Sequence, residues 1–193
     1  MQAWSLDILR ALEHLHGLDP VVMHRDLKPA NVLVTRDRRT LKLADFGLAK
    51  SFPRGHEPRG APGPPRGGEA SPDHTCSVGT PRYAAPEVLG AGAGSQHAAY
   101  TEKADVYSAA LVIWYLLTGW RPACDVRKCP RGRPDAGAAR RRWRAMGALL
   151  ERMWDHDPAG RPGAGECVGT VLGMAGGGMG GCAPGGRGVC PVQ

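Results

Sequence analysis

The sequence predicts a mainly α fold with short β-hairpins, and three observations support this fold class. Apolar residues recur at three- and four-residue spacing over 2–16, 101–117 and 139–154, which is the period of a helix that buries one face. Apolar triplets at 32–34 and 41–43 flank a polar turn, as they do in a hairpin. The chain also holds 28 Gly and 17 Pro, which gather between these segments and predict long irregular connections.

The first predicted helix, 2–16, ends at Gly17 and Pro20. The central one, 101–117, has Thr101 as a candidate N-cap and Gly119 as its stop. Its apolar stretch is too short to span a bilayer and suits a buried core helix, so we expect no membrane span.

Helical spacing returns at 139–154, and residues 164–174 suit a last short helix. Residues 51–75 contain six prolines and no periodicity, which predicts a flexible loop. The Gly-rich segment 175–193 is expected to be a disordered tail, which leaves 1–174 as the folded domain.

The net charge is +7, and two interpretations of this excess of Arg remain open. Clustered Arg binds nucleic-acid phosphates without sequence preference, but abundant Arg also accompanies the abundant Ala, Gly and Pro of a GC-rich coding sequence. No aromatic residues alternate with the basic ones, so we expect no specific nucleic-acid partner. The six cysteines form no CxxC pair and suit free thiols in a reducing, cytoplasmic compartment.

Four short motifs occur in a fixed order along the chain. They are His24–Asn31 (HRDLKPAN), Asp45–Gly47 (DFG), Gly79–Glu87 (GTPRYAAPE) and Asp105–Ser108 (DVYS). Each one alone is weak evidence, but their order and spacing together are specific. In these motifs the sequence resembles the eukaryotic protein kinase family, over about residues 2–174.

The resemblance implies a serine/threonine protein kinase that uses ATP and Mg²⁺ and acts on a protein with Ser or Thr hydroxyls. Phosphoryl transfer needs a group that orients the attacking hydroxyl and metal ions that neutralise the phosphates. Asp26 is expected to accept the hydroxyl proton and Lys28 to steady the transferred group, while Asn31 and Asp45 offer the oxygen ligands that Mg²⁺ prefers. Leu33 resembles the residue that packs under the adenine ring.

Substrate class follows from two residue types. Lys28 and Thr80 are typical of serine/threonine-specific members, and Thr80 completes the implied catalytic set of Asp26, Lys28, Asn31 and Thr80. The amino-acid sequence of the segments around 100–119 and 154–162 resembles that of the tyrosine-kinase-like group of these enzymes.

Other matched positions imply structural or regulatory roles. His24 and Phe46 resemble the stacked apolar spine of the family, Asp105 is expected to accept bonds from the catalytic-loop backbone, and Glu87 with Arg161 resembles a buried ion pair. Arg25 resembles the arginine that pairs with a phosphorylated residue of the activation loop, here about 48–84. The candidate phosphate acceptors are Ser51, Ser71, Thr75 and Ser77.

The sequence departs from the family in the elements that hold the phosphates of ATP. It has no glycine-rich phosphate loop followed by a strand lysine. We therefore expect a protein-kinase-like C-lobe with short β-hairpins at the catalytic cleft and with the N-lobe absent, as in a fragment of an enzyme. The competing interpretation is a non-catalytic kinase-like protein that binds and regulates a partner.

Overall fold

The structure is a computed structural model that describes residues 2–54, 80–90, 101–122, 134 and 144–176. The predicted tail from 177 onward, most of the predicted loop, and the candidate acceptors Ser71, Thr75 and Ser77 lie outside the described residues. No helix of the described part is long and apolar enough to cross a membrane.

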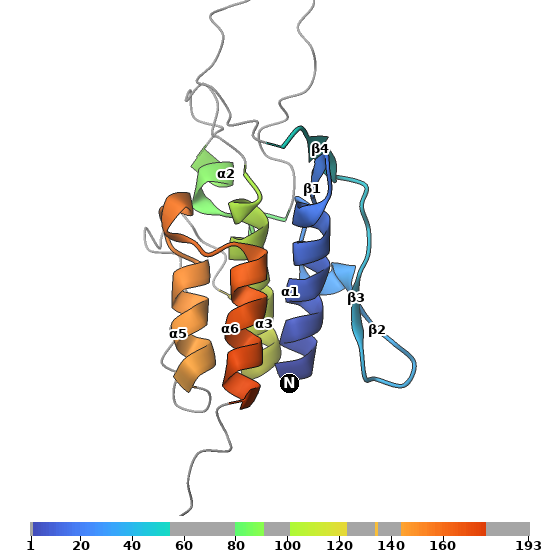
Figure 1. Cartoon of the computed structure of the whole chain (residues 1–193), viewed down its shortest axis with the longest axis vertical. Helices are drawn as coiled ribbons and strands as arrows, with labels where there is room; N and C mark the ends of the chain where they lie inside the picture. The colour runs from blue at the N-terminus through green and yellow to red at the C-terminus, as the bar shows by residue number, and fades with distance from the viewer. Residues whose placement is uncertain (1, 55–79, 91–100, 123–133, 135–143, 177–193) are drawn as a thin grey trace, which may run out of the picture.

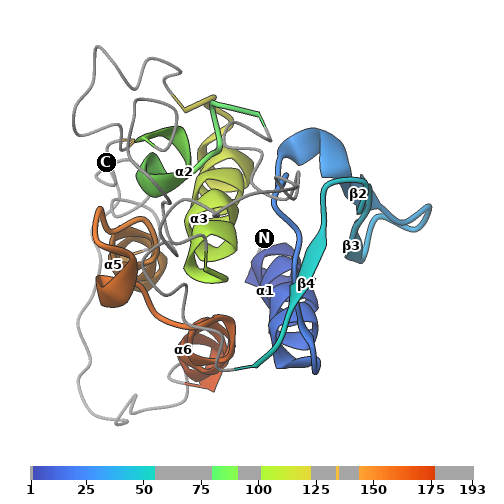
Figure 2. The ribbon, with the colours of Figure 1, turned by 90° about the horizontal axis from the view of Figure 1, so that it is seen from above.

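The helices run alongside one another and the strands gather beside α1 (Figures 1 and 2). The helical elements are α1 (Gln2–Gly17), α2 (Pro86–Gly90), α3 (Lys103–Thr118), α5 (Arg144–Met153) and α6 (Ala164–Gly176), with short 3₁₀ turns at Pro29–Asn31 and Pro158–Gly160. The strands are β1 (Val21–Met23), β2 (Val32–Val34), β3 (Leu41–Leu43) and β4 (Lys50–Phe52).

Helix α3 forms the centre of the core. Every residue from Ala104 to Trp114 is buried, because α1 packs on one side of the helix and α5 on another. The helix ends where Gly119 adopts a left-handed φ of 75° and donates its N–H to the Tyr115 carbonyl at 2.8 Å. The predicted stop is therefore confirmed. The predicted N-cap is wrong, because Glu102 occupies that position.

The strands form two antiparallel pairs. Strands β2 and β3 form the predicted hairpin, with Leu33 opposite Lys42. Strands β1 and β4 pair with Met23 opposite Lys50, although a long stretch of chain separates them. This second pair is not a hairpin, and no turn signal in the sequence predicted it.

The fold class expected from the sequence is therefore wrong. The sequence predicted a C-lobe alone, with short β-hairpins at the catalytic cleft and with the N-lobe absent. The structure has β-strands in sheets in the N-terminal part of the chain, which fits an N-lobe and not a fragment made only of a C-lobe. Local periodicity could not reveal the pairing of β1 with β4, because that pairing depends on how the intervening chain folds back.

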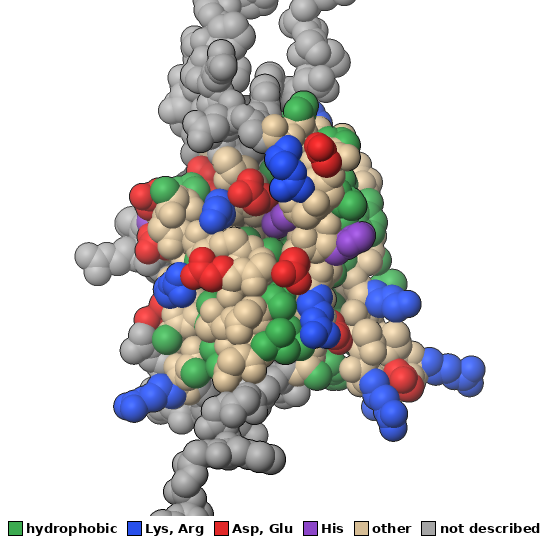
Figure 3. Space-filling model, in the orientation of Figure 1, with side chains coloured by type: hydrophobic (Ala, Val, Ile, Leu, Met, Phe, Trp, Pro, Cys, Tyr) green, Lys and Arg blue, Asp and Glu red, His purple; other side chains and the backbone are tan. Residues whose placement is uncertain are grey.

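Charged side chains of both signs are interspersed over the face shown in Figure 3. Basic side chains extend furthest at the turn between β2 and β3, where Arg36, Arg38 and Arg39 are exposed. The same turn contains Asp37, whose carboxylate accepts bonds from Thr35 and from the Arg39 amide.

Candidate active site

The loop between β1 and β2 is fixed at its start by one buried carboxylate. Asp105, 1% exposed in the first turn of α3, accepts the His24 N–H at 2.8 Å and the Arg25 N–H at 2.9 Å. Arg25 has a left-handed φ of 66°, a backbone conformation that costs about 1–3 kcal/mol for a residue other than glycine. The two bonds to Asp105 hold the chain in this conformation directly before Asp26.

Asp26 is 7% exposed, and donors surround both of its carboxylate oxygens. The Lys28 ammonium lies 2.5 Å from Oδ2, and the Asn31 amide donates to the same oxygen at 3.2 Å and to the Asp26 carbonyl at 2.9 Å. Oδ1 accepts the Thr80 N–H at 3.0 Å and the Thr80 hydroxyl at 3.1 Å. The structure thus brings together Asp26, Lys28, Asn31 and Thr80, the four residues that the sequence placed in one set.

These contacts set the charge state of Asp26. Burial raises the pKa of its carboxyl group, but the hydrogen bonds from Lys28 and Thr80 and the Lys28 charge outweigh that effect. The pKa of Asp26 therefore lies below its usual value of 3.8, and the group is a carboxylate at neutral pH.

The free space beside Asp26 is small. A cavity of about 10 Å³ is bordered by Asp26, Thr80 and the adjoining backbone and side chains of Arg25, Leu27, Tyr83, Ala84 and Ser108. Such a volume holds about one water molecule. A hydroxyl group that approached Asp26 would have to replace one of its present donors.

Asp45 lies next to this loop, just after β3. The Ala44 N–H donates to the Asn31 carbonyl at 2.9 Å, and the His24 ring nitrogen Nε2 contacts the Ala44 carbonyl at 3.1 Å. Asp45 is exposed with a left-handed φ of 62°, and its Oδ1 accepts the Gly47 N–H at 3.3 Å. A Cβ at Gly47 would lie 3.2 Å from that oxygen, so glycine permits the close approach.

The apolar and ring side chains of the site differ in their exposure to solvent. The rings of His24 and Phe46 lie 5.1 Å apart at 47°, an arrangement within the range of favourable ring contacts. His24 is fully buried, whereas Phe46 is 47% exposed and Leu33, the expected neighbour of the adenine ring, is 55% exposed.

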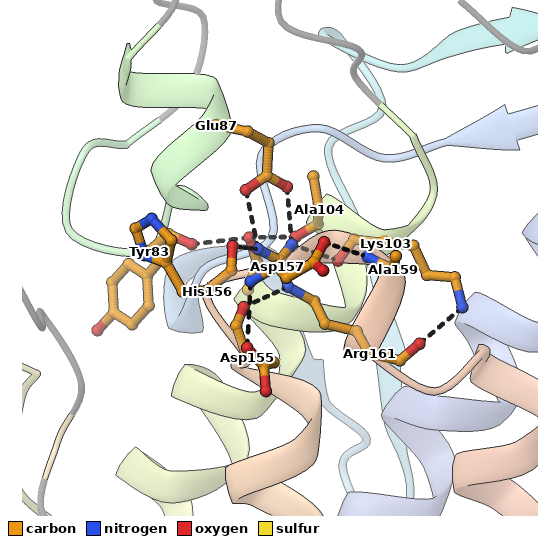
Figure 4. Close-up of polar contacts among 10 residues, drawn as sticks. Tyr83, Glu87, Lys103, Ala104, Asp155, His156, Asp157, Ala159 and Arg161 are labelled. Atoms are coloured by element: carbon orange, nitrogen blue, oxygen red, sulfur yellow. Dashed lines mark hydrogen bonds and ion pairs between the residues drawn. The ribbon is translucent and has the colours of Figure 1, made fainter.

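Glu87, in the first turn of α2, forms a buried ion pair with Arg161 (Figure 4). The guanidinium donates to the two carboxylate oxygens at 2.7 and 2.8 Å and to three backbone carbonyls, those of Lys103, Asp155 and His156. All five of its N–H groups therefore have acceptors. Its central carbon also lies 4.9 Å from the centre of the Tyr107 ring.

The ion pair fixes the segment that carries Thr80. Glu87 follows Thr80 along this segment, and the Ser108 hydroxyl of α3 donates to the Tyr83 carbonyl at 2.7 Å. The same segment is thus attached to the core at two points on the C-terminal side of Thr80.

Of the candidate regulatory residues, two are described. Ser51 lies on β4 with an exposed side chain, and Arg25 is half-buried at the start of the catalytic loop. The bond between His16 and Asp105 could not be predicted from the sequence, because no local pattern links residues so far apart.

Comparison with known proteins identifies the family. The sequence model of the protein kinase domain matches residues 1–171. The chain belongs to the eukaryotic protein kinase family. Because the match runs through the β-strands and the helices alike, it also argues against the predicted C-lobe fragment.

Several curated relatives of this kinase domain are named as serine/threonine-protein kinases. The domain is 40% identical over 118 residues to the probable serine/threonine-protein kinase drkC of Dictyostelium discoideum, which covers 61% of this chain and 13% of the relative. It is 35% identical over 181 residues to the probable serine/threonine-protein kinase drkD of the same organism, and the match covers 88% of this chain and 12% of the relative. The serine/threonine-protein kinase STY46 of Arabidopsis thaliana is 32% identical over 172 residues, and the match covers 85% of this chain and 25% of the relative. The chain therefore spans at most about a quarter of the length of these relatives.

Proposed function

We propose that this kinase domain transfers the γ-phosphoryl group of ATP to Ser or Thr hydroxyls of a protein substrate, with Asp26 as the base. The observation that carries the proposal is the surroundings of the Asp26 carboxylate, where Lys28, Asn31 and Thr80 converge from two separate segments. Phosphoryl transfer depends mainly on positioning and electrostatic stabilisation, and these residues supply both.

In the proposed reaction the substrate oxygen bonds to the γ-phosphorus as the bond from that phosphorus to the ADP oxygen breaks. Asp26 accepts the hydroxyl proton. Its lowered pKa makes it a weak base, which suits a proton that leaves late, when the hydroxyl oxygen is already bonding to phosphorus.

Lys28 is the donor that must move. A carboxylate has about four sites for hydrogen bonds, and in this structure four donor groups already occupy Asp26. The substrate hydroxyl needs one of them. Lys28 has the longest and most flexible side chain of the three donor residues, so its ammonium can turn from Asp26 to the transferred phosphoryl group.

Asn31 and Asp45 fit a Mg²⁺ site. The Asn31 amide nitrogen is turned to Asp26, which leaves its amide oxygen for a ligand, and Asp45 has an exposed carboxylate beside the same loop. One carboxylate and one amide oxygen suit Mg²⁺, which keeps several water ligands and takes others from phosphates. When bound, the ion would neutralise charge on the triphosphate.

Three further assignments belong to the proposal. Arg25 is proposed to pair with a phosphate in the activation segment, with Ser51 as the described acceptor. The domain is proposed to belong to the tyrosine-kinase-like group, on the basis of its sequence similarity to that group. Residues 1–174 are proposed as the domain and the remainder as a tail.

A second candidate function is a binding protein without catalysis. The exposure of Leu33 and Phe46 favours it, because apolar side chains at a site are also the mark of a surface that a partner covers. The two functions differ in one measurable respect, since a binding role does not require the Asp26 carboxylate.

The test is Mg²⁺- and ATP-dependent phosphorylation of a generic protein substrate by the full chain. Asp26→Asn and Asp45→Asn are expected to abolish it, and phosphoamino-acid analysis is expected to find phosphoserine or phosphothreonine. Asp37→Asn is the matched control, because this exposed carboxylate lies in the β2–β3 turn and should leave the rate unchanged. Equal rates in the wild type and Asp26→Asn would reject the enzymatic function and favour the binding role.

A further inference from the structure

Asp105, which fixes the candidate catalytic loop, has a third donor that lies outside the loop. The ring nitrogen Nε2 of His16, in the last turn of α1, lies 3.0 Å from Asp105 Oδ2. The side chains are 8% and 1% exposed, so water competes little for this bond. The bond joins α1 to α3 at the point where α3 holds the loop.

The chemistry of this pair determines which ring nitrogen of His16 carries the proton. A carboxylate only accepts hydrogen bonds, so Nε2 must carry the hydrogen. Nδ1 of His16 is buried and has no hydrogen-bond partner among the described residues. The polar role of this ring in the described structure is therefore directed at Asp105 alone.

We infer that His16 is a positioning residue for the catalytic loop and acts through Asp105. Oδ2 of Asp105 accepts from both His16 and the His24 N–H, while Oδ1 accepts the Arg25 N–H. The His16 bond resists rotation of the carboxylate about its Cβ–Cγ axis. That rotation would break the bonds to two successive peptide groups, and these groups hold Arg25 in its left-handed conformation before Asp26. The effect on catalysis rests on the proposed function, but the effect on the loop backbone does not.

Packing alone does not explain this histidine. His16 borders a cavity of about 390 Å³ that is also lined by Glu13, Arg54 and Glu102. A side chain selected only to fill apolar space would be enclosed by apolar neighbours. A ring that borders a cavity lined in part by charged side chains, and that turns one nitrogen to a buried carboxylate, is better explained by the hydrogen bond.

Two amide substitutions separate the bond from the volume. The terminal nitrogen of Gln can occupy the place of Nε2, whereas that of the shorter Asn corresponds to Nδ1 and cannot reach Asp105. His16→Gln is therefore expected to preserve the bond and His16→Asn to remove it. His14→Gln and His14→Asn are matched controls, because His14 lies on the same helix with an exposed side chain.

The first measurement is amide hydrogen exchange of His24 and Arg25 by NMR in the full chain. Loss of one hydrogen bond to a charged group predicts that exchange at both amides accelerates about tenfold in His16→Asn, and His16→Gln should restore rates to within about threefold of the wild type. The His14 variants should leave both rates unchanged. Circular dichroism checks that each variant is folded.

The second measurement is kinetic. With phosphorylation as the assay, His16→Asn should lower kcat and leave KM for ATP nearly unchanged, and His16→Gln should recover kcat. If the wild type does not phosphorylate any substrate, the proposed function fails, while the exchange rates still decide the role of His16.

The inference is wrong if His16→Asn and His16→Gln give the same exchange rates at His24 and Arg25. Should either variant fail to fold, the ¹⁵N spectrum of the wild-type imidazole decides instead. A proton on Nε2 supports the assignment, and an Nε2 without a proton overturns it.

Discussion

The ion pair of Glu87 and Arg161 gives the sharpest prediction for stability. The guanidinium side chain is 0% exposed and Glu87 is 14% exposed, so removal of the carboxylate leaves an uncompensated charge away from water. Removing one partner of a buried pair costs about 3–5 kcal/mol. Glu87→Ala is therefore expected to lower the free energy of unfolding by about that amount, although three backbone carbonyls still accept from Arg161.

The assay is urea unfolding of the full chain at neutral pH, followed by circular dichroism. The matched control is Glu166→Ala, which removes an ion pair with Arg152 whose side chains are 54% and 53% exposed. Exposed pairs contribute about 0–1 kcal/mol, so the control should change stability very little. A cost for Glu87→Ala no larger than that of Glu166→Ala would refute the argument from burial.

A double variant tests the mechanism of this cost. Glu87→Ala combined with Arg161→Met removes the buried charge together with its partner. The double variant should therefore be destabilised by less than the sum of the two single variants, with a coupling of about 0.5–3 kcal/mol. Strict additivity would show that the two residues do not stabilise each other.

Three further predictions concern single groups. Thr80→Val removes the hydroxyl bond to Asp26 and keeps the backbone bond, so kcat should fall about tenfold, the equivalent of about 1.4 kcal/mol; an unchanged kcat would contradict a role for the hydroxyl. The pKa of Asp26 lies below its usual value of 3.8, so this group stabilises the folded protein above that pH and stops doing so as the pH falls through its pKa in the folded state. Lys28→Met removes a cause of the lowered pKa and should therefore move the midpoint of acid unfolding to higher pH. An unchanged midpoint would contradict this. Burial first, and then the Glu166 charge, raise the pKa of Cys167 from 9.0 to about 12, so the folded protein should lose this contribution as the pH rises from about 9 towards 12. At neutral pH Cys167 should resist alkylation until the chain is unfolded in urea, as peptide mass spectrometry would show.

Local sequence patterns were sufficient for much of the candidate site. The order of the motifs around Asp26, Asp45 and Glu87 pointed to the family that the comparison then identified. Helical periodicity located α1, α3 and α5, because a helix that buries one face repeats its apolar residues every three or four positions. Gly119 marked the end of α3 because glycine adopts the left-handed conformation at little cost.

The sequence alone determined which residue types stand at each motif, and so the family and the kind of chemistry to expect. Only the tertiary structure decided which of them meet: Asp26 with Thr80, Asp105 with His16, and β1 with β4. The physical reason is that these contacts depend on the path of the intervening backbone, including the left-handed turn at Arg25, and on burial that no local pattern encodes. The expected fold class failed for the same reason, because periodicity describes single elements and not how distant elements pair.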